Sequence, residues 1–74
     1  MANWVDIQIG LRVRKFRTDA SIDLPTAAKI CGQTLHEYQR SERGLRQFTP
    51  KELFNLSNVF GVGLWDFFLD EAWN

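Results

Sequence analysis

The sequence contains little of what several large classes of protein require. Its 74 residues include a single cysteine, Cys31, which allows neither an internal disulfide nor a cysteine zinc site. No apolar run approaches the ~20 residues that span a bilayer, and the first residues lack the basic segment of a secretory signal. These absences favour a soluble, cytoplasmic protein in which Cys31 fills apolar space rather than reacts.

The residue sets that enzymes use are also missing. No paired carboxylates, no Ser-His-Asp or Cys-His set and no glycine-rich phosphate loop is evident. Gly61-Val62-Gly63 follows a helical pattern rather than a strand, so it indicates a helix end. His36 is the one histidine, and with no ligating residue beside it we expect neither a metal site nor general-base catalysis. We therefore predict that the chain is not an enzyme, and we expect no cofactor, metal or small-molecule ligand.

The net charge is zero, but the charges are unevenly placed along the chain. Residues 1–51 carry all nine basic residues and five acids, a balance of +4, whereas residues 52–74 carry four acids and no Lys or Arg. A basic body with an acidic end can present a positive face to nucleic acid. Overall neutrality nevertheless predicts weak non-specific DNA binding, because phosphate contacts determine that affinity.

Apolar periodicity and helix signals predict five short helices and no strand of useful length. The expected segments are about Asp6–Arg17, Leu24–Cys31, Leu35–Glu42, a fourth helix between Thr49 and Gly61, and a last one from Leu64 to Trp73. Thr49 and Glu52 form a capping box around Pro50, which is the strongest start signal in the chain. We expect a single compact all-α domain over residues 1–74.

The stretch at about 24–42 has the spacing of a helix-turn-helix. Ala28 is small enough to let two helices approach closely, and Gly32, four residues later, allows a sharp turn. Tyr38 lies six residues beyond Gly32, where its ring returns to the core side. Together the three positions predict two short helices joined by a tight turn.

With these residues in place, the sequence resembles the phage-repressor/Cro-like (XRE-type) helix-turn-helix DNA-binding family. The resemblance extends from about Ile9 to Phe68, and the matching residues are Ile9-Gly10, Arg12, Arg14, Phe16-Arg17, Ala28, Gly32, Thr34, Tyr38, Glu42-Arg43-Gly44, Thr49-Pro50, Leu53, Leu56, Phe60-Gly61-Val62 and Asp66-Phe67-Phe68. It implies a compact five-helix lambda-repressor-like domain whose third helix lies in the DNA major groove. The sequence departs from the family pattern at Leu24, where a phosphate-binding Gln is usual, and at Gln33, Gln39 and Ser41, where hydrophobic or small residues are usual.

The resemblance also implies which residues meet DNA. Base contacts are implied for Leu35, His36 and Arg40, with Gln39 as a further candidate, and Arg40 can hold a guanine through N7 and O6. Phosphate contacts are implied for Thr34, Arg43 and Arg46, with Gln47, Arg14 and Lys15 as further candidates. Arg17 and Glu42 correspond to an ion pair that joins the first helix to the end of the third, so Glu42 is interpreted as structural.

Simpler interpretations of some of these side chains remain open. Arg12, Arg14 and Lys15 also fit the solvated face of an amphipathic helix, and His36 also fits a solvent-exposed position without a DNA contact. Among the aromatic residues, burial in the core is the commoner role. A chain this short cannot bury all ten rings, however, so the candidates for a dimer or partner surface are Trp4, Trp65, Phe68 and Trp73.

These observations predict a sequence-specific transcriptional regulator that binds double-stranded DNA, similar to a small Cro-like repressor or a DNA-binding antitoxin. We expect a cytoplasmic, nucleoid-associated homodimer, at least on DNA, that is regulated by its abundance, its dimerisation or a second protein. The alternative is a protein-interaction module of the same fold with weak or no DNA binding, which neutrality, Leu24 and the aromatic residues favour. If Arg40, Arg43 and Arg46 dominate the electrostatic field on the face of the third helix, DNA is favoured as the ligand. If Glu37 and Glu42 dominate it, a protein partner is favoured.

Overall fold

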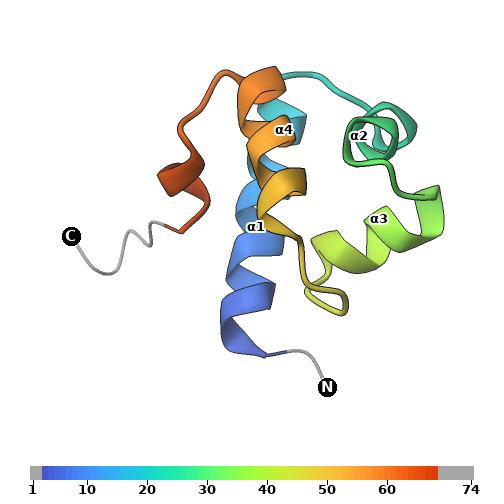
Figure 1. The fold of residues 1–74 in the computed structure, drawn as a ribbon, viewed down its shortest axis with the longest axis vertical. Helices are drawn as coiled ribbons and strands as arrows, with labels where there is room; N and C mark the ends of the chain where they lie inside the picture. Colours follow the sequence, from blue (N-terminus) through green and yellow to red (C-terminus); the bar gives the residue numbers. More distant parts are fainter. Residues whose placement is uncertain (1–2, 69–74) are drawn as a thin grey trace.

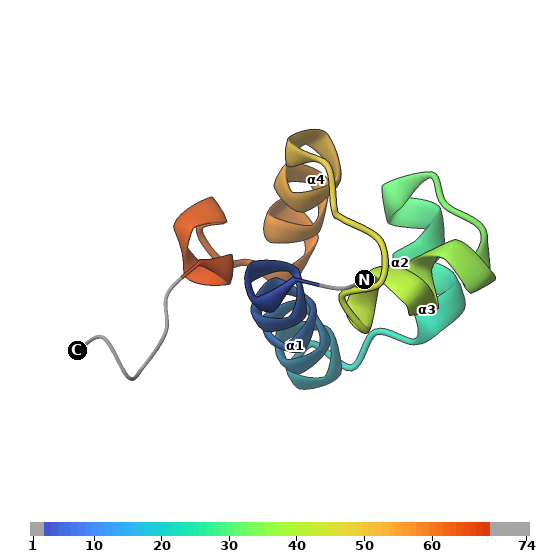
Figure 2. The ribbon, with the colours of Figure 1, turned by 90° about the horizontal axis from the view of Figure 1, so that it is seen from below.

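The computed structural model describes residues 3–68, and within this range the chain forms four α-helices and one short 3-10 helix (Figure 1). The elements are α1 (Trp4–Asp19), α2 (Leu24–Cys31), α3 (Leu35–Glu42), α4 (Pro50–Phe60) and the 3-10 helix η1 (Leu64–Phe67). Figures 1 and 2 show α2 and α3 on one side of α1 and α4, with η1 on the other side. No helix in this part of the chain is both long and apolar enough to cross a membrane.

Local signals explain the bounds of α2, α3 and α4, which begin and end where the sequence predicts. The carboxylate of Asp23 caps α2 by accepting from the N–H of Thr26 at 2.9 Å. Gly32 ends the same helix with a φ of 70°, a left-handed conformation that favours glycine. Both α3 and α4 begin with a capping box, after Thr34 and Thr49 respectively.

The first helix is longer than predicted at both ends. The side chain of Asn3 caps it by accepting from the N–H of Asp6 at 2.8 Å, so that α1 begins at Trp4. It continues to Asp19, about two residues beyond the predicted end.

The prediction of a fifth α-helix is wrong for the described residues. Only a four-residue 3-10 helix forms there, and the carboxylate of Asp66 closes its start by accepting from the N–H of Gly63 at 2.8 Å. Phe67 from this turn is buried and packs edge-to-face against Phe16 of α1 at 5.7 Å between ring centroids. The remainder of the predicted helix, including Trp73, lies outside the described residues.

The core gathers side chains from every element. Its buried apolar members are Ile9, Val13, Ala27, Ala28, Tyr38, Phe48, Leu53, Leu56 and Phe67. Tyr38 is completely buried, as its spacing from Gly32 predicts. Cys31 packs against this core, and burial raises the pKa of its thiol to about 12, so the thiol stays protonated at neutral pH.

Candidate nucleic-acid interface

Helix α3 has one buried face and one exposed face. Tyr38, Ser41 and Glu42 point inward and are buried. The four residues predicted to contact bases are Leu35, His36, Gln39 and Arg40, and all of them are exposed. Leu35 with Gln39 and His36 with Arg40 are i, i+4 pairs that form two adjacent rows along the helix, so the structure places these four side chains on one exposed surface. We call this surface the reading face.

The capping box at the start of α3 holds a carboxylate beside the reading face. The N–H of Thr34 donates to Glu37 at 2.9 Å, and the hydroxyl of Thr34 accepts from the N–H of Glu37 at 3.1 Å. These bonds lower the pKa of Glu37, with the backbone bond from Thr34 as the largest cause. The hydroxyl hydrogen of Thr34 remains able to donate to a phosphate.

A shallow polar groove of about 210 Å³ runs beside α3, between α1 and the start of α2. Its lining residues are Leu11, Arg14, Arg17, Leu24, Gln39, Glu42 and Arg43. The structure therefore brings Arg14 and Arg43, two predicted phosphate contacts, to the same groove, and both side chains are exposed. Lys15 is exposed on α1 but does not line this groove, so its predicted contact has no such support.

A buried ion pair joins α1 to the end of α3. Arg17 donates through Nε to Oε2 of Glu42 at 2.6 Å and through Nη2 to Oε1 at 3.3 Å. Arg17 also donates through Nη1 to the carbonyl of Ile22 at 2.9 Å. The hydrogen bond to Glu42 is the largest cause of the raised pKa of Arg17. These bonds hold the C-terminal end of α3, the helix that carries the reading face, against α1.

Gly10 lets the backbones of the same two helices approach closely. A Cβ at this position would collide with the carbonyl of Glu42 and would lie 3.0 Å from the carbonyl oxygen of Ser41. A larger residue would therefore push α3 away from α1. The sequence contained a clue to this close approach. Gly10 lies inside a predicted helix, where glycine is unfavourable and is usually kept only if packing requires it.

Sequence reasoning did not predict a second polar cluster, behind the reading face. Gln33 and Ser41, which stand where hydrophobic residues are usual in the resembled family, are both buried and joined by a hydrogen bond of 3.0 Å from Ser41 Oγ to Gln33 Oε1. Arg46 continues this cluster, since it donates to Ser41 Oγ at 3.3 Å and forms an ion pair with Glu52 at 3.1 Å. The sequence did contain a clue to this cluster: Gln33 and Ser41, eight residues apart, are both polar where the resembled family usually has hydrophobic residues.

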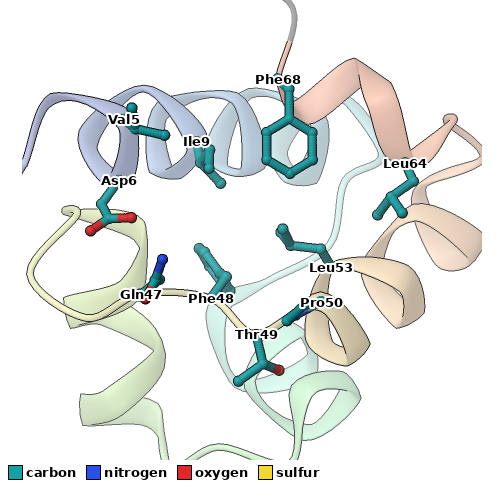
Figure 3. A pocket seen from close by; sticks show the side chains of 10 residues that line it. All are labelled: Val5, Asp6, Ile9, Gln47, Phe48, Thr49, Pro50, Leu53, Leu64 and Phe68. Atoms are coloured by element: carbon teal, nitrogen blue, oxygen red, sulfur yellow. The ribbon is translucent and has the colours of Figure 1, made fainter.

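An apolar groove of about 410 Å³ lies where the start of α1 meets the start of α4 and η1, and none of its lining residues belongs to α3 (Figure 3). Its lining residues are Val5, Asp6, Ile9, Gln47, Phe48, Thr49, Pro50, Leu53, Leu64 and Phe68. Phe68 is the one described residue of the predicted partner surface that lines it. Trp4 and Trp65 are 67% and 78% exposed but are not among the lining residues.

Comparisons with known proteins agree with this architecture. The chain is 32% identical over 66 residues to a Rhodospirillum rubrum protein named as an uncharacterized transcriptional regulator in the ATPase CF(0) region. The match covers 89% of the chain but 61% of that relative, so the chain spans about three fifths of the relative's length. No protein-family model matches the sequence.

Two solved structures have the same fold. The restriction-modification controller protein C.AhdI from Aeromonas hydrophila superimposes with a TM-score of 0.74 at 22% identity, covering 84% of this chain and 94% of that one. The DNA-binding domain of BldD also gives a TM-score of 0.74 at 22% identity, covering 93% of this chain and 100% of that one. The resemblance predicted from the sequence is thus confirmed in the fold: this chain has the helix-turn-helix architecture of these regulators.

Proposed function

We propose that the chain is a small transcriptional regulator that binds double-stranded DNA sequence-specifically, with α3 in the major groove. The observation that carries this proposal is the reading face, where Leu35, His36, Gln39 and Arg40 are all exposed on one helix of suitable size for the groove. The name of the Rhodospirillum rubrum relative and the DNA-binding domain of BldD support the same function.

The roles that we propose follow from where each side chain lies. Arg40 and Gln39 can form bidentate contacts to base edges, His36 can donate to a base, and Leu35 can contact a thymine methyl. Arg43 and Arg14 would bind backbone phosphate at the polar groove. Thr34, Gln47 and Lys15 are exposed and remain further candidates for phosphate contacts.

The charged side chains around α3 favour DNA as the ligand of this surface over a protein partner that would bind its acidic residues. Of the two acids near the reading face, Glu42 is neutralised by its ion pair with Arg17, whereas Glu37 keeps its charge because its hydrogen bonds with Thr34 lower its pKa. Arg40 and Arg43 are exposed, and neither forms an ion pair within the described part of the chain. Arg40 and Arg43 therefore outnumber Glu37, the one acid there without an ion pair among the described residues, and this net positive charge favours a DNA backbone.

Replacing Arg40 by alanine is expected to weaken binding at the preferred site by about 1–3 kcal/mol and to relax the preference at one base pair. The measurement is a titration of wild type and Arg40→Ala against the preferred duplex and against each single-base variant of it. Lys29→Ala, an exposed cation on α2, is a suitable control for charge alone. A loss of equal size on every duplex would assign Arg40 to a phosphate and contradict the base-reading role.

We also propose that the regulator acts in the cytoplasm as a homodimer, with a second protein able to modulate it. One short reading helix discriminates poorly, whereas two helices on half-sites one DNA turn apart multiply the discrimination. The exposed rings of Trp65 and Phe68, which pack edge-to-face at 6.2 Å, offer an apolar surface for this contact. Sedimentation should show a dimer at high micromolar concentration or on DNA, and a strict monomer under both conditions would contradict the proposal.

The second candidate is a protein-interaction module of this fold. The apolar groove and the exposed rings beside it favour this function, because monomers rarely expose such surface without a use. Capture of a protein partner together with no DNA binding at low salt would favour it over the regulator.

A further inference from the structure

Arg46 is held by internal acceptors despite its position in the loop beside α3. Its Nη1 lies 3.3 Å from Ser41 Oγ, 3.3 Å from the carbonyl of Gln47 and 3.1 Å from Glu52 Oε1. Its Nη2 lies 3.2 Å from Glu52 Oε2, which completes a two-point contact with the carboxylate. Nη1 thus has more acceptors within range than hydrogens to give them.

The acceptors of Arg46 lie in α3, in its own loop and in α4. Ser41 lies in α3, and its one hydroxyl hydrogen has two acceptors at 3.0 Å: Oε1 of Gln33 in the helix-turn-helix turn and the carbonyl of Glu37 in α3. Glu52 lies in the first turn of α4, where it accepts from the N–H of Thr49 at 2.8 Å. A series of polar contacts therefore runs from the reading helix through the loop to α4, and it extends to the turn when Ser41 donates to Gln33.

This connection matters because α3 packs mainly on α1 and α2. Few direct contacts tie it to α4, so the polar series supplies the link on that side. The ion pair is partly shielded, with Glu52 buried and the Arg46 side chain 31% exposed. Glu52 also places a negative charge beside the guanidinium, which opposes a simultaneous approach of a phosphate.

We propose that Arg46 is a positioning residue that braces the reading helix against α4 through Ser41 and Glu52, and that it does not contact the DNA backbone. Its part in DNA binding rests on the function proposed above. The sequence resemblance implied a phosphate contact for Arg46, as for Arg43, so the two arginines make a matched pair for a test.

The experiment measures the affinity of wild type, Arg46→Ala, Arg46→Lys and Arg43→Ala for a mixed-sequence duplex between 50 and 200 mM salt. A brace predicts that Arg46→Ala weakens binding by a similar factor at each salt concentration and leaves the salt slope unchanged. Arg43→Ala should instead reduce the slope by about one. Lysine should not rescue position 46, because an ammonium cannot make the two-point contact. A reduced slope for Arg46→Ala that lysine restores would overturn the proposal.

A second measurement tests the Arg46–Glu52 part of the brace without DNA. A double-mutant cycle of Arg46→Ala and Glu52→Gln, followed by chemical unfolding, should show a coupling of about 3-fold or more in the unfolding equilibrium constant. Additive effects would overturn the brace. If wild type binds no duplex at any salt, the proposed regulator function fails, and this cycle still gives an answer for Arg46.

Discussion

Replacing Arg17 by alanine is expected to destabilise the fold by about 3–5 kcal/mol, because it leaves the carboxylate of Glu42 buried without its partner. The side chains of Arg17 and Glu42 are only 10% and 8% exposed, so water cannot replace the lost bonds at low cost. A chain of this length has a total stability of about 4–11 kcal/mol. The variant should therefore unfold at much lower temperature and denaturant concentration, which circular dichroism would measure.

Two further variants make this prediction specific. Glu42→Ala should cost a similar amount, because it leaves a buried guanidinium whose remaining bond is to the carbonyl of Ile22. Lys15→Ala, an exposed change on the same helix, should stay within about 0.5 kcal/mol of wild type. Loss of less than about 1 kcal/mol in both variants of the pair would show that it does not hold α1 to α3.

Replacing Gly44 by alanine is expected to cost about 2–4 kcal/mol, from backbone strain and overpacking together. Gly44 follows α3 with a φ of 77°, which side-chain-bearing residues rarely adopt. An added Cβ would also lie 2.7 Å from the Cα of Ile7 and 2.8 Å from its Cγ1, so α1 and the end of the reading helix would have to separate. Urea unfolding would measure the loss.

Gly61 provides a matched control for Gly44. It has nearly the same left-handed backbone, with a φ of 71°, but a Cβ there would meet nothing within 4 Å. Gly61→Ala should therefore cost only the strain, about 1–2 kcal/mol. Equal losses at the two positions would mean that contact with Ile7 contributes nothing, and that the approach of α1 to α3 tolerates a methyl group.

Most of the fold follows from local signals in the sequence. Asp23, Thr34 and Thr49 mark three helix starts because their side-chain oxygens accept from nearby N–H groups, a contact that depends only on sequence neighbours. The same logic, applied to Asn3 and Asp6, would have placed the start of α1 correctly. The last segment was predicted less well than the others. Its aromatic residues have a spacing that is compatible both with a longer helix and with the single turn observed, which buries Phe67.

The site could be predicted only in part. Periodicity is enough to place Leu35, His36, Gln39 and Arg40 on one face once α3 is recognised. The bond between Gln33 and Ser41 and the bond between Arg46 and Glu52 depend instead on how the turn, loop and α4 pack in three dimensions. Spacing alone therefore could not distinguish Arg46, which is held internally, from Arg43, which is exposed.

Selection of bound duplexes from a random DNA library at two salt concentrations tests whether α3 reads DNA sequence-specifically. We expect enrichment of a palindrome whose half-sites lie about one helical turn apart, with weaker binding of unrelated sequences at the higher salt. Such a result would give the operator and would support the dimer. Failure to enrich any sequence, with no DNA retained even at low salt, would contradict the claim and favour the protein-interaction module.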